Sequence, residues 1–206
     1  MKILIVYATD GQTARIARRL SLRLSRTNHD VRLSDIASLP RSVDVYAFDA
    51  ILVGGSVHVL GYQRRVKRFV RENLTALQSR PSAFFSVGVA IASRSAKERA
   101  AAQEVPRRFC ARTGWTPDHV EVIAGALAFS RYGFLRRFFM KRIAEKEMGQ
   151  PVDTTRDHEF TDWARVDAFA SAFARRLERR RRAVAILHPL PDEPLSSGAS
   201  LEGGVP

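Results

Sequence analysis

The sequence predicts an α/β fold in which a doubly wound, five-stranded parallel sheet carries helices on both faces. Residues 3–8 form a continuous apolar run without alternation, which is typical of a strand buried on both faces. The next segment places Ile16, Leu20 and Leu24 at helical spacing with arginines between them. Four further apolar runs then alternate with helical segments, which is the pattern of a parallel sheet with crossover helices.

Each later strand is indicated by a short apolar run. Residues 31–33 predict a weak second strand, 50–53 a strong third, 83–90 a fourth and 120–124 a fifth. The apolar residues that mark a helix between the third and fourth strands are Val66, Phe69, Val70, Leu74 and Leu77. About 20 residues rich in Ala, Arg and Glu follow Ala90 and should be partly helical; a connection of this length is often functional.

The C-terminal part contains two more predicted helices, over residues 134–143 and 161–177. Thr161 is a suitable N-cap for the second of them. A run of arginines fills residues 179–182, and the 24 residues that follow contain four prolines and three glycines with little periodicity. We therefore expect one domain over residues 1–177, and over 178–206 a basic run and a disordered tail.

The chain is strongly basic, with 34 Lys and Arg against 21 Asp and Glu and a net charge of +13. Three of the acids and none of the bases lie after residue 182, so residues 1–182 carry +16. Such a field attracts nucleic acid, anionic lipid or an anionic small molecule, and charge alone does not choose among them. The single cysteine, Cys110, excludes an internal disulfide and any site built from several cysteines.

The start of the chain reads as a first strand and not as a signal peptide, because the apolar run passes directly into polar turn residues. No run approaches the roughly 20 apolar residues of a membrane-spanning helix. We therefore expect a cytoplasmic protein.

Ligands of such sheets bind at the carboxyl ends of the strands, so the loops there are the first candidate sites. The loop after the first strand leads into the N-terminus of a helix, which suits a phosphate. Its candidate residues are Thr9, Asp10, Gly11, Gln12, Thr13 and Ala14. It lacks the glycine patterns of dinucleotide-binding folds and P-loops, and a plain capped turn is the alternative. A phospho-acceptor receiver domain is disfavoured because the third strand ends in glycines instead of acids.

The loops after the third and fourth strands are candidates for binding a flat ring. The glycine pair of the second loop allows close backbone approach, as an isoalloxazine ring requires. The residues concerned are Gly54, Gly55, Ser56, Val57, His58, Gly61 and Tyr62 in the second loop, and Ser86, Val87, Gly88, Val89 and Ala90 in the third. Ordinary loop packing is the alternative for His58 and Tyr62.

Taken in this order, the three loops resemble the flavodoxin fold. The segments 81–87, 122–127, 131–132 and 149–163 resemble more narrowly the bacterial flavodoxin-type, menaquinone-dependent protoporphyrinogen oxidases. The resemblance covers residues 1–177, and its most specific parts are Ala124-Gly-Ala-Leu127 and Thr161-Asp-Trp163. The chain departs from the family pattern in a first loop one residue shorter and in Gln150-Pro151, where a Gly-Gly pair is common.

The resemblance implies that the three loops bind FMN noncovalently. It also implies removal of hydrogens from protoporphyrinogen IX in haem biosynthesis, with electrons passed to a membrane quinone. No catalytic acid or base is predicted, because in flavin enzymes the cofactor carries the redox chemistry. A homo-oligomer is possible.

A basic amphipathic segment over residues 131–143 predicts peripheral attachment to the inner face of the cell membrane. Its apolar residues are Phe134, Leu135, Phe138, Phe139 and Ile143, and its basic residues Arg136, Arg137, Lys141 and Arg142. A surface helix that buries its aromatic side on the sheet is the alternative.

Two other functions remain as alternatives to the quinone-linked enzyme. A flavodoxin-like electron carrier without its own substrate fits the general part of the resemblance, although such carriers are typically acidic. A nucleic-acid-binding module rests only on net charge and residues 179–182, so no nucleic acid partner is expected.

Overall fold

The computed structural model describes the chain except for residues 9–10, 41, 59–60, 128–144, 146–152 and 188–206. Its centre is a parallel sheet in the order β2-β1-β3-β5-β6. The strands are β1 (Lys2–Ala8), β2 (Asp30–Asp35), β3 (Ala50–His58), β5 (Ser82–Gly88) and β6 (His119–Ala124). A short strand, β4 (Gly61–Tyr62), pairs antiparallel with β3. The predicted five-stranded parallel sheet is confirmed.

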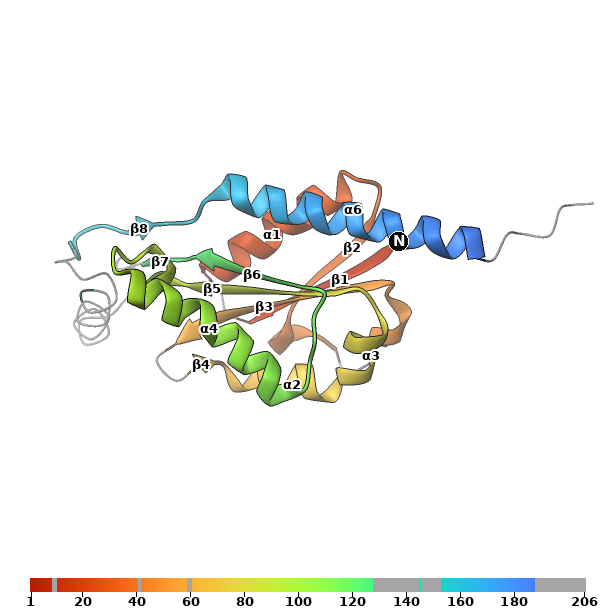
Figure 1. Cartoon of the computed structure of the whole chain (residues 1–206), viewed down its shortest axis with the longest axis horizontal. Coiled ribbons are helices and arrows are strands. Elements are labelled where there is room, and N and C mark those ends of the chain that lie inside the picture. The colour runs from red at the N-terminus through yellow and green to blue at the C-terminus, as the bar shows by residue number, and fades with distance from the viewer. Residues whose placement is uncertain (9–10, 41, 59–60, 128–144, 146–152, 188–206) are drawn as a thin grey trace, which may run out of the picture.

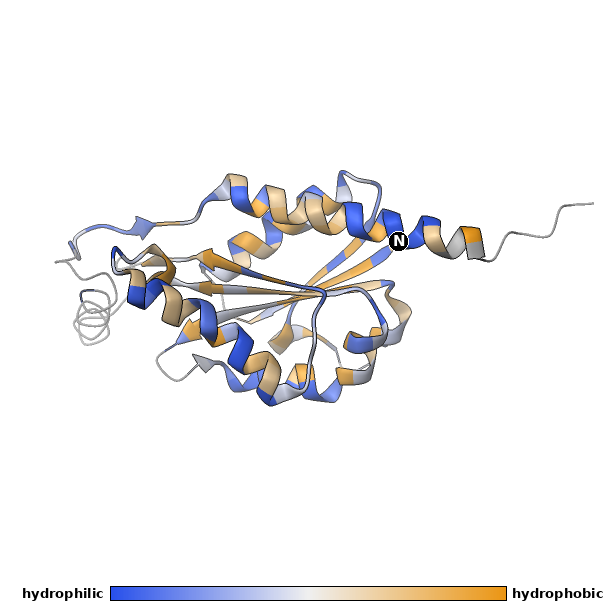
Figure 2. Cartoon of the chain, viewed as in Figure 1, coloured by the Kyte–Doolittle hydropathy of each residue, from blue (hydrophilic) through white to orange (hydrophobic). Residues whose placement is uncertain are grey.

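Helices cover both faces of the sheet (Figure 1). On one face lie α1 (Gln12–Ser25) and α6 (Trp163–Leu187), and on the other lie α2 (Arg64–Glu72), α3 (Leu74–Ser79) and α4 (Ala96–Thr113). Side chains alternate along each strand, so Ile3 and Ile5 enter the core under α1 and α6 while Leu4 and Val6 enter the other. The apolar strands between the two helical layers stand out in Figure 2. Burial on both faces explains their continuous apolar runs.

The segments between the third and fifth strands differ from their prediction in two ways. Residues 64–79 form two helices instead of one, and they break at Asn73, whose side-chain amide donates to the Phe69 carbonyl at 2.8 Å. The fourth strand ends at Gly88, and Val89–Ala92 form a short 3₁₀ helix, η3. Helix α4 then fills the Ala- and Arg-rich stretch, which is therefore an ordinary crossover helix.

The last helix also differs from its prediction at both ends. Asp162 caps it, since its carboxylate accepts the Arg165 N–H at 3.1 Å, whereas the Thr161 hydroxyl donates to the Ala124 carbonyl. The helix continues to Leu187, ten residues beyond the predicted end, so residues 183–187 are helical and not part of a tail. The predicted tail from residue 188 and the predicted helix over 134–143 lie outside the described residues, and the division into domain and tail stays a prediction.

Two arginines of α1 bind one carboxylate of α6 and fix the two helices side by side. Arg19 donates from Nε and Nη2 to the Asp167 carboxylate at 2.7 Å each, and Arg23 Nη2 donates to the same group. The Asp167 side chain is only 17% exposed. The hydrogen bonds from Arg23 and Arg19 hold the pKa of Asp167 well below its usual range.

Replacing Asp167 by asparagine should therefore lower the free energy of unfolding by about 1 to 3 kcal/mol near neutral pH. Because the folded-state pKa is below the unfolded one, the stabilisation is present above about pH 4 and is lost as pH falls through the folded-state pKa. Urea unfolding of the wild type and Asp167→Asn at several pH values measures this difference. Glu104→Gln, which breaks an exposed ion pair with Arg107, is the control and should cost less than about 0.5 kcal/mol. A difference that persists unchanged at pH 2 would contradict the role of the ionised carboxylate.

Candidate functional site

The strand register brings the three predicted loops to one edge of the sheet. Ala8 at the end of β1 pairs with Gly55 of β3, and Gly55 pairs with Ser86 of β5. Next to them, Gly88 pairs with Ala124 of β6. The helix after β1 covers one face of the sheet, and the helices after β3 cover the other. The strand order therefore reverses between β1 and β3, and ligands of such sheets bind at the carboxyl ends of the strands at this point. Thr9 and Asp10 lie outside the described residues.

The N-terminus of α1 has the features of a phosphate-binding end. Gly11 precedes its first turn with a φ of +94°, and a Cβ added there would meet nothing within 4 Å. Among the described residues no side chain caps this end, and its first turn holds no acidic residue. Within the part of the chain that the structure describes, the first-turn amides of Gln12, Thr13 and Ala14 therefore meet no capping side chain, and they suit an anion. These residues fit the phosphate of FMN.

The two polar side chains of this turn differ in what they contact. Thr13 is only 2% exposed, and among the described residues its hydroxyl has no hydrogen-bond partner. Gln12 Nε2 instead donates to Thr161 Oγ1 at 2.7 Å and to Glu159 Oε1 at 3.1 Å. The Gln12 side chain thus links α1 to the start of α6, and its predicted role in binding the phosphate stays a prediction.

The glycine pair of the second loop is explained by packing of protein rings. A Cβ on Gly54 would lie 2.1 Å from Cζ of Phe85, and one on Gly55 would lie 2.8 Å from Cδ1 of Tyr62. Both positions are buried. The close approach of Phe85 and Tyr62 is therefore a sufficient reason for the two glycines, and their predicted contact with a flavin ring stays a prediction.

Tyr62 holds the second and third loops together. Its hydroxyl donates to Ser86 Oγ at 2.6 Å, and its ring packs edge-on against Phe84 and Phe109 with centroids 5.0 and 4.8 Å away. Burial raises the pKa of the Tyr62 phenol well above its ordinary value. These contacts are the ordinary loop packing that the sequence analysis gave as the alternative to a ligand role for Tyr62. His58 is exposed at the end of β3, with Nε2 3.3 Å from Nε2 of Gln63.

The end of β5 borders a small cavity of about 30 Å³. Its lining includes Val57, Ser86, Gly88, Val89 and Ala90. Small-molecule sites usually need several hundred Å³, and this space holds about one water. This cavity is too small to hold a flavin ring.

The loop after β5 is held by a hydrogen-bonded cap that sequence reasoning missed. Ser95 Oγ accepts the Glu98 N–H at 3.3 Å, and the Glu98 carboxylate accepts the Ser93 hydroxyl at 2.6 Å. Arg99 donates to the Ser93 and Arg94 carbonyls. The signal was present, because Ser95 and Glu98 have the spacing of a capping box.

The two segments that carried the resemblance lie together beside α1. Strand β7 (Ala126–Leu127) pairs with β8 (His158–Glu159), and the Gly125 N–H donates to the Gly88 carbonyl at 3.1 Å. Thr161 Oγ1 joins them by donating to the Ala124 carbonyl at 2.8 Å while it accepts from Gln12.

Two residues that sequence reasoning missed, Arg15 and Glu159, meet Trp163 at this corner of the site. Arg15 donates to Glu159 at 2.6 Å and lies over the Trp163 ring, and Trp163 Nε1 donates to the same carboxylate at 2.7 Å. Partial burial opposes ionisation of Glu159, but the hydrogen bonds from Arg15, Trp163 and Gln12 outweigh it and lower its pKa. Nothing in the local sequence links residues this far apart in the chain.

Among the described residues, neither Cys110 nor a set of metal ligands contributes to this site. Burial raises the pKa of the Cys110 thiol to about 11, so it stays protonated at neutral pH. In the part of the chain that the structure describes, no three His, Cys, Asp or Glu side chains cluster as metal ligands would.

Comparison with known proteins decides the family. Residues 4–155 match the model of the flavodoxin domain. The chain is 34% identical over 177 residues to the protoporphyrinogen IX dehydrogenase [quinone] of Escherichia coli (strain K12). The aligned region covers 84% of this chain and 95% of that protein. The chain belongs to this family. The family member of Leishmania major is 33% identical over 84% of this chain and 74% of its own length.

Solved structures agree with the fold. Oxidised flavodoxin 1 from Bacillus cereus superposes with a TM-score of 0.52 at 13% identity, over 85% of this chain and 98% of that one. A flavodoxin from the domain Archaea superposes with a TM-score of 0.51 at 17% identity, over 86% of this chain and 99% of that one. The predicted flavodoxin-like fold and the predicted family are confirmed. Across the described helices, none has the length and apolar character to cross a bilayer.

Proposed function

We propose that this protein is an FMN-dependent enzyme that oxidises protoporphyrinogen IX to protoporphyrin IX and passes the electrons to a quinone. The observation that carries the proposal is the 34% identity to a protoporphyrinogen IX dehydrogenase over 95% of that protein's length. The flavodoxin domain confirms the predictions of a flavoprotein and an oxidoreductase that uses FMN.

The residues at the sheet edge hold the cofactor. When bound, FMN supplies two-electron redox chemistry. The first-turn amides of α1 and the Thr13 hydroxyl bind its phosphate, and the ends of β3 and β5 border its ring. The Tyr62 and Ser86 hydrogen bond and the cap at Ser95 fix the two ring-binding loops. Hydrogens leave the porphyrinogen in pairs, and reduction of the quinone takes up each pair of electrons and protons.

The net charge favours these partners over the carrier function. The phosphate of FMN and the propionates of a porphyrinogen are anions, and the quinone lies in a membrane with an anionic surface, so a chain of +13 is attracted to each. A nucleic acid partner is not proposed, and a homo-oligomer stays a prediction.

Steady-state turnover separates the enzyme from the carrier. The purified protein loaded with FMN should convert protoporphyrinogen IX to fluorescent protoporphyrin IX when a quinone is added, and a preparation stripped of FMN should not. Protein that takes up no FMN would contradict the proposal. Rapid reduction by a flavodoxin reductase, with no turnover of porphyrinogen, would show an electron carrier instead.

Peripheral attachment to an anionic membrane is the second part of the proposal. It rests on residues 131–143, which lie outside the described residues. Each basic residue near an anionic surface contributes about 1 kcal/mol, and salt screens the attraction. The protein should therefore sediment with anionic vesicles at low ionic strength.

A quadruple variant tests the segment directly. Replacing Arg136, Arg137, Lys141 and Arg142 by glutamine should release the protein from the vesicles. The matched control replaces four exposed arginines, Arg18, Arg71, Arg108 and Arg112, and should stay bound more strongly than the quadruple variant. If both variants sediment equally well, the segment is not the attachment site.

A further inference from the structure

A groove lies where α1 ends and α6 continues. The two helices run in the same direction, since Arg15 lies beside Trp163 and Arg19 binds Asp167. Helix α1 has 14 residues and α6 has 25, so at 1.5 Å per residue α6 extends well past the last turn of α1. The groove beside this extension has a volume of about 530 Å³, within the range of small-molecule sites.

The face of α6 that borders the groove is mostly polar and basic. Its residues there are Ser171, Ala174, Arg175, Glu178, Arg179 and Arg182, at spacings of three and four. The face that packs on the sheet is apolar, with Phe169, Phe173 and Leu177. The groove therefore carries three positive charges and one negative charge. Among the described residues, none of the four charged side chains forms a hydrogen bond or an ion pair.

The turn from α1 to β2 forms the other wall, with Thr27 and His29. Asn28 adopts a φ of +62°, and the chain turns there so that His29 is only 6% exposed. Both ring nitrogens of His29 are buried without a hydrogen-bond partner in the described structure. A buried polar group without a partner costs about 1 to 3 kcal/mol, so such a group usually has one.

The groups that surround His29 have mixed charge. Burial lowers the pKa of the imidazole, as do the N-terminal amine and Arg181, while Glu178 acts in the opposite direction. Bringing an anion among the groove arginines would oppose this lowering. The pKa of the His29 imidazole should therefore change when an anion binds in the groove.

We propose that this groove binds the phosphate group of a small amphipathic molecule, between Arg175, Arg179 and Arg182 and beside the wall that His29 forms. A phosphate carries nearly two negative charges and three acceptor oxygens, which matches the net charge of +2 and several guanidinium groups. A carboxylate has one charge and two oxygens, and one arginine satisfies it. The apolar part would cover Ala174 and the methylene groups of the arginines.

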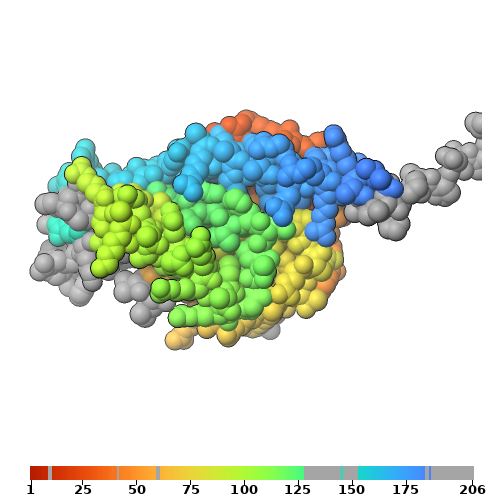
Figure 3. Space-filling view, viewed as in Figure 1, coloured from red at the N-terminus to blue at the C-terminus, as the bar shows by residue number. Residues whose placement is uncertain are grey.

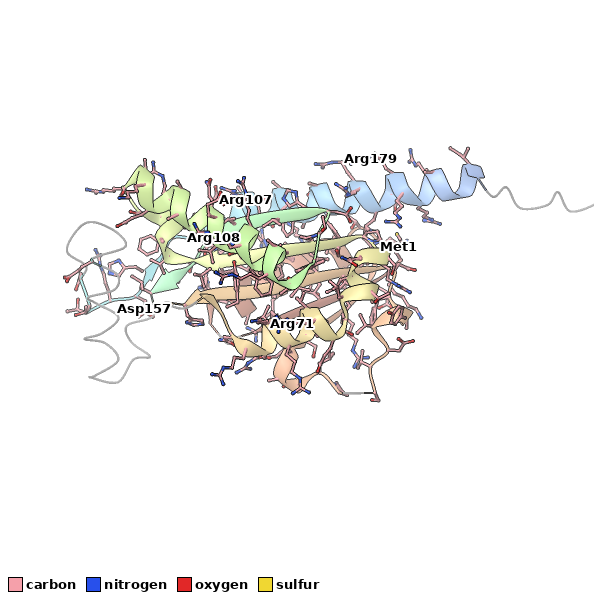
Figure 4. All side chains as sticks on the ribbon, turned by 60° about the horizontal axis from the view of Figure 1, so that its bottom comes forward. Met1, Arg71, Arg107, Arg108, Asp157 and Arg179 are labelled. Atoms are coloured by element: carbon pink, nitrogen blue, oxygen red, sulfur yellow. The ribbon has the colours of Figure 1, made fainter. Side chains whose placement is uncertain are left out.

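The groove is separate from the cofactor site. Figure 4 shows Arg179 and Met1 toward one end of the molecule and Asp157, next to β8, at the other. In the space-filling view the C-terminal part of α6 extends past the body at this end (Figure 3). FMN content and porphyrinogen turnover are therefore independent readouts, and the proposal stands or falls separately from the enzymatic function.

Phenyl phosphate is the probe, added to the FMN-loaded full-length protein with ¹⁵N-labelled histidine. The His29 ring signals, assigned with His29→Asn, should shift saturably. Affinity should fall at least tenfold in Arg175→Gln/Arg179→Gln/Arg182→Gln. It should change less than twofold in Arg71→Gln/Arg108→Gln/Arg112→Gln, which removes the same charge from exposed positions. No saturable shift would show that water alone occupies the groove.

Two further probes identify the source of the phosphate. Benzoate should bind at least tenfold more weakly, and equal binding would overturn the assignment to phosphate. Vesicles containing phosphatidic acid should retain the control variant better than the groove variant if the phosphate belongs to a lipid headgroup. Equal retention together with phenyl phosphate binding would identify a free phosphate compound. Equal loss of phenyl phosphate binding in the two triple variants would overturn the site.

Discussion

Replacing Gly54 by alanine should lower the free energy of unfolding by about 3 kcal/mol, the scale of overpacking in a closed core. The added Cβ would lie 2.1 Å from Cζ of Phe85, closer than any real carbon contact. Phe85 is fully buried between the sheet and the α1 and α6 layer, so its ring has little room to move. Urea unfolding followed by circular dichroism measures the loss.

Two further variants show whether the ring is the cause. Phe85→Leu should cost less in the Gly54→Ala background than in the wild type, because the clash disappears. Gly88→Ala is the control, since its Cβ would lie an ordinary 3.4 Å from Val57 and should cost less than about 1 kcal/mol. If Gly54→Ala is as stable as the wild type but binds FMN poorly, the glycine serves the cofactor and not the core.

Replacing Thr13 by alanine should weaken FMN binding by about 1 to 3 kcal/mol, which corresponds to roughly 5- to 150-fold in Kd. Thr13 is 2% exposed as a residue, and its hydroxyl has no other hydrogen-bond partner among the described residues, so a phosphate is its natural acceptor. The measurement is a titration of FMN fluorescence against protein stripped of cofactor.

The control for this change is Thr75→Ala, an exposed threonine on α3, which should leave FMN affinity unchanged. Unfolding of the cofactor-free variants separates lost binding from lost stability. Unaltered affinity in a Thr9→Ala/Thr13→Ala double variant would show that the phosphate loop has been misassigned.

The strands were predictable because a strand buried on both faces must be apolar throughout, and such runs stand out in a chain this rich in arginine. The end of α6 was not predictable from hydrophobic spacing. Residues 179–182 present no apolar face, yet arginine and alanine favour helix, so the helix continues beyond the core. Thr161 and Asp162 are both good caps, and only the tertiary contact of Thr161 with Ala124 decides between them.

The candidate site was predictable where it depends on local chain geometry. A turn between a buried strand and a helix predicts a helix N-terminus that faces a ligand, and Gly11 to Ala14 form it. Contacts between distant residues left no local signal. The Gln12 side chain finds Thr161, and the space over Gly54 is filled by Phe85, because the fold places them there. His29 is a single histidine before a strand, with no pattern to mark it.

Anaerobic mixing of the FMN-loaded protein with protoporphyrinogen IX, without any quinone, tests the proposed reaction most directly. The visible absorbance of the oxidised flavin should disappear as protoporphyrin fluorescence rises, and added quinone should restore the absorbance and drive further product. Flavin that stays oxidised in the presence of protoporphyrinogen IX, in protein that a flavodoxin reductase still reduces, would contradict the enzyme and identify an electron carrier.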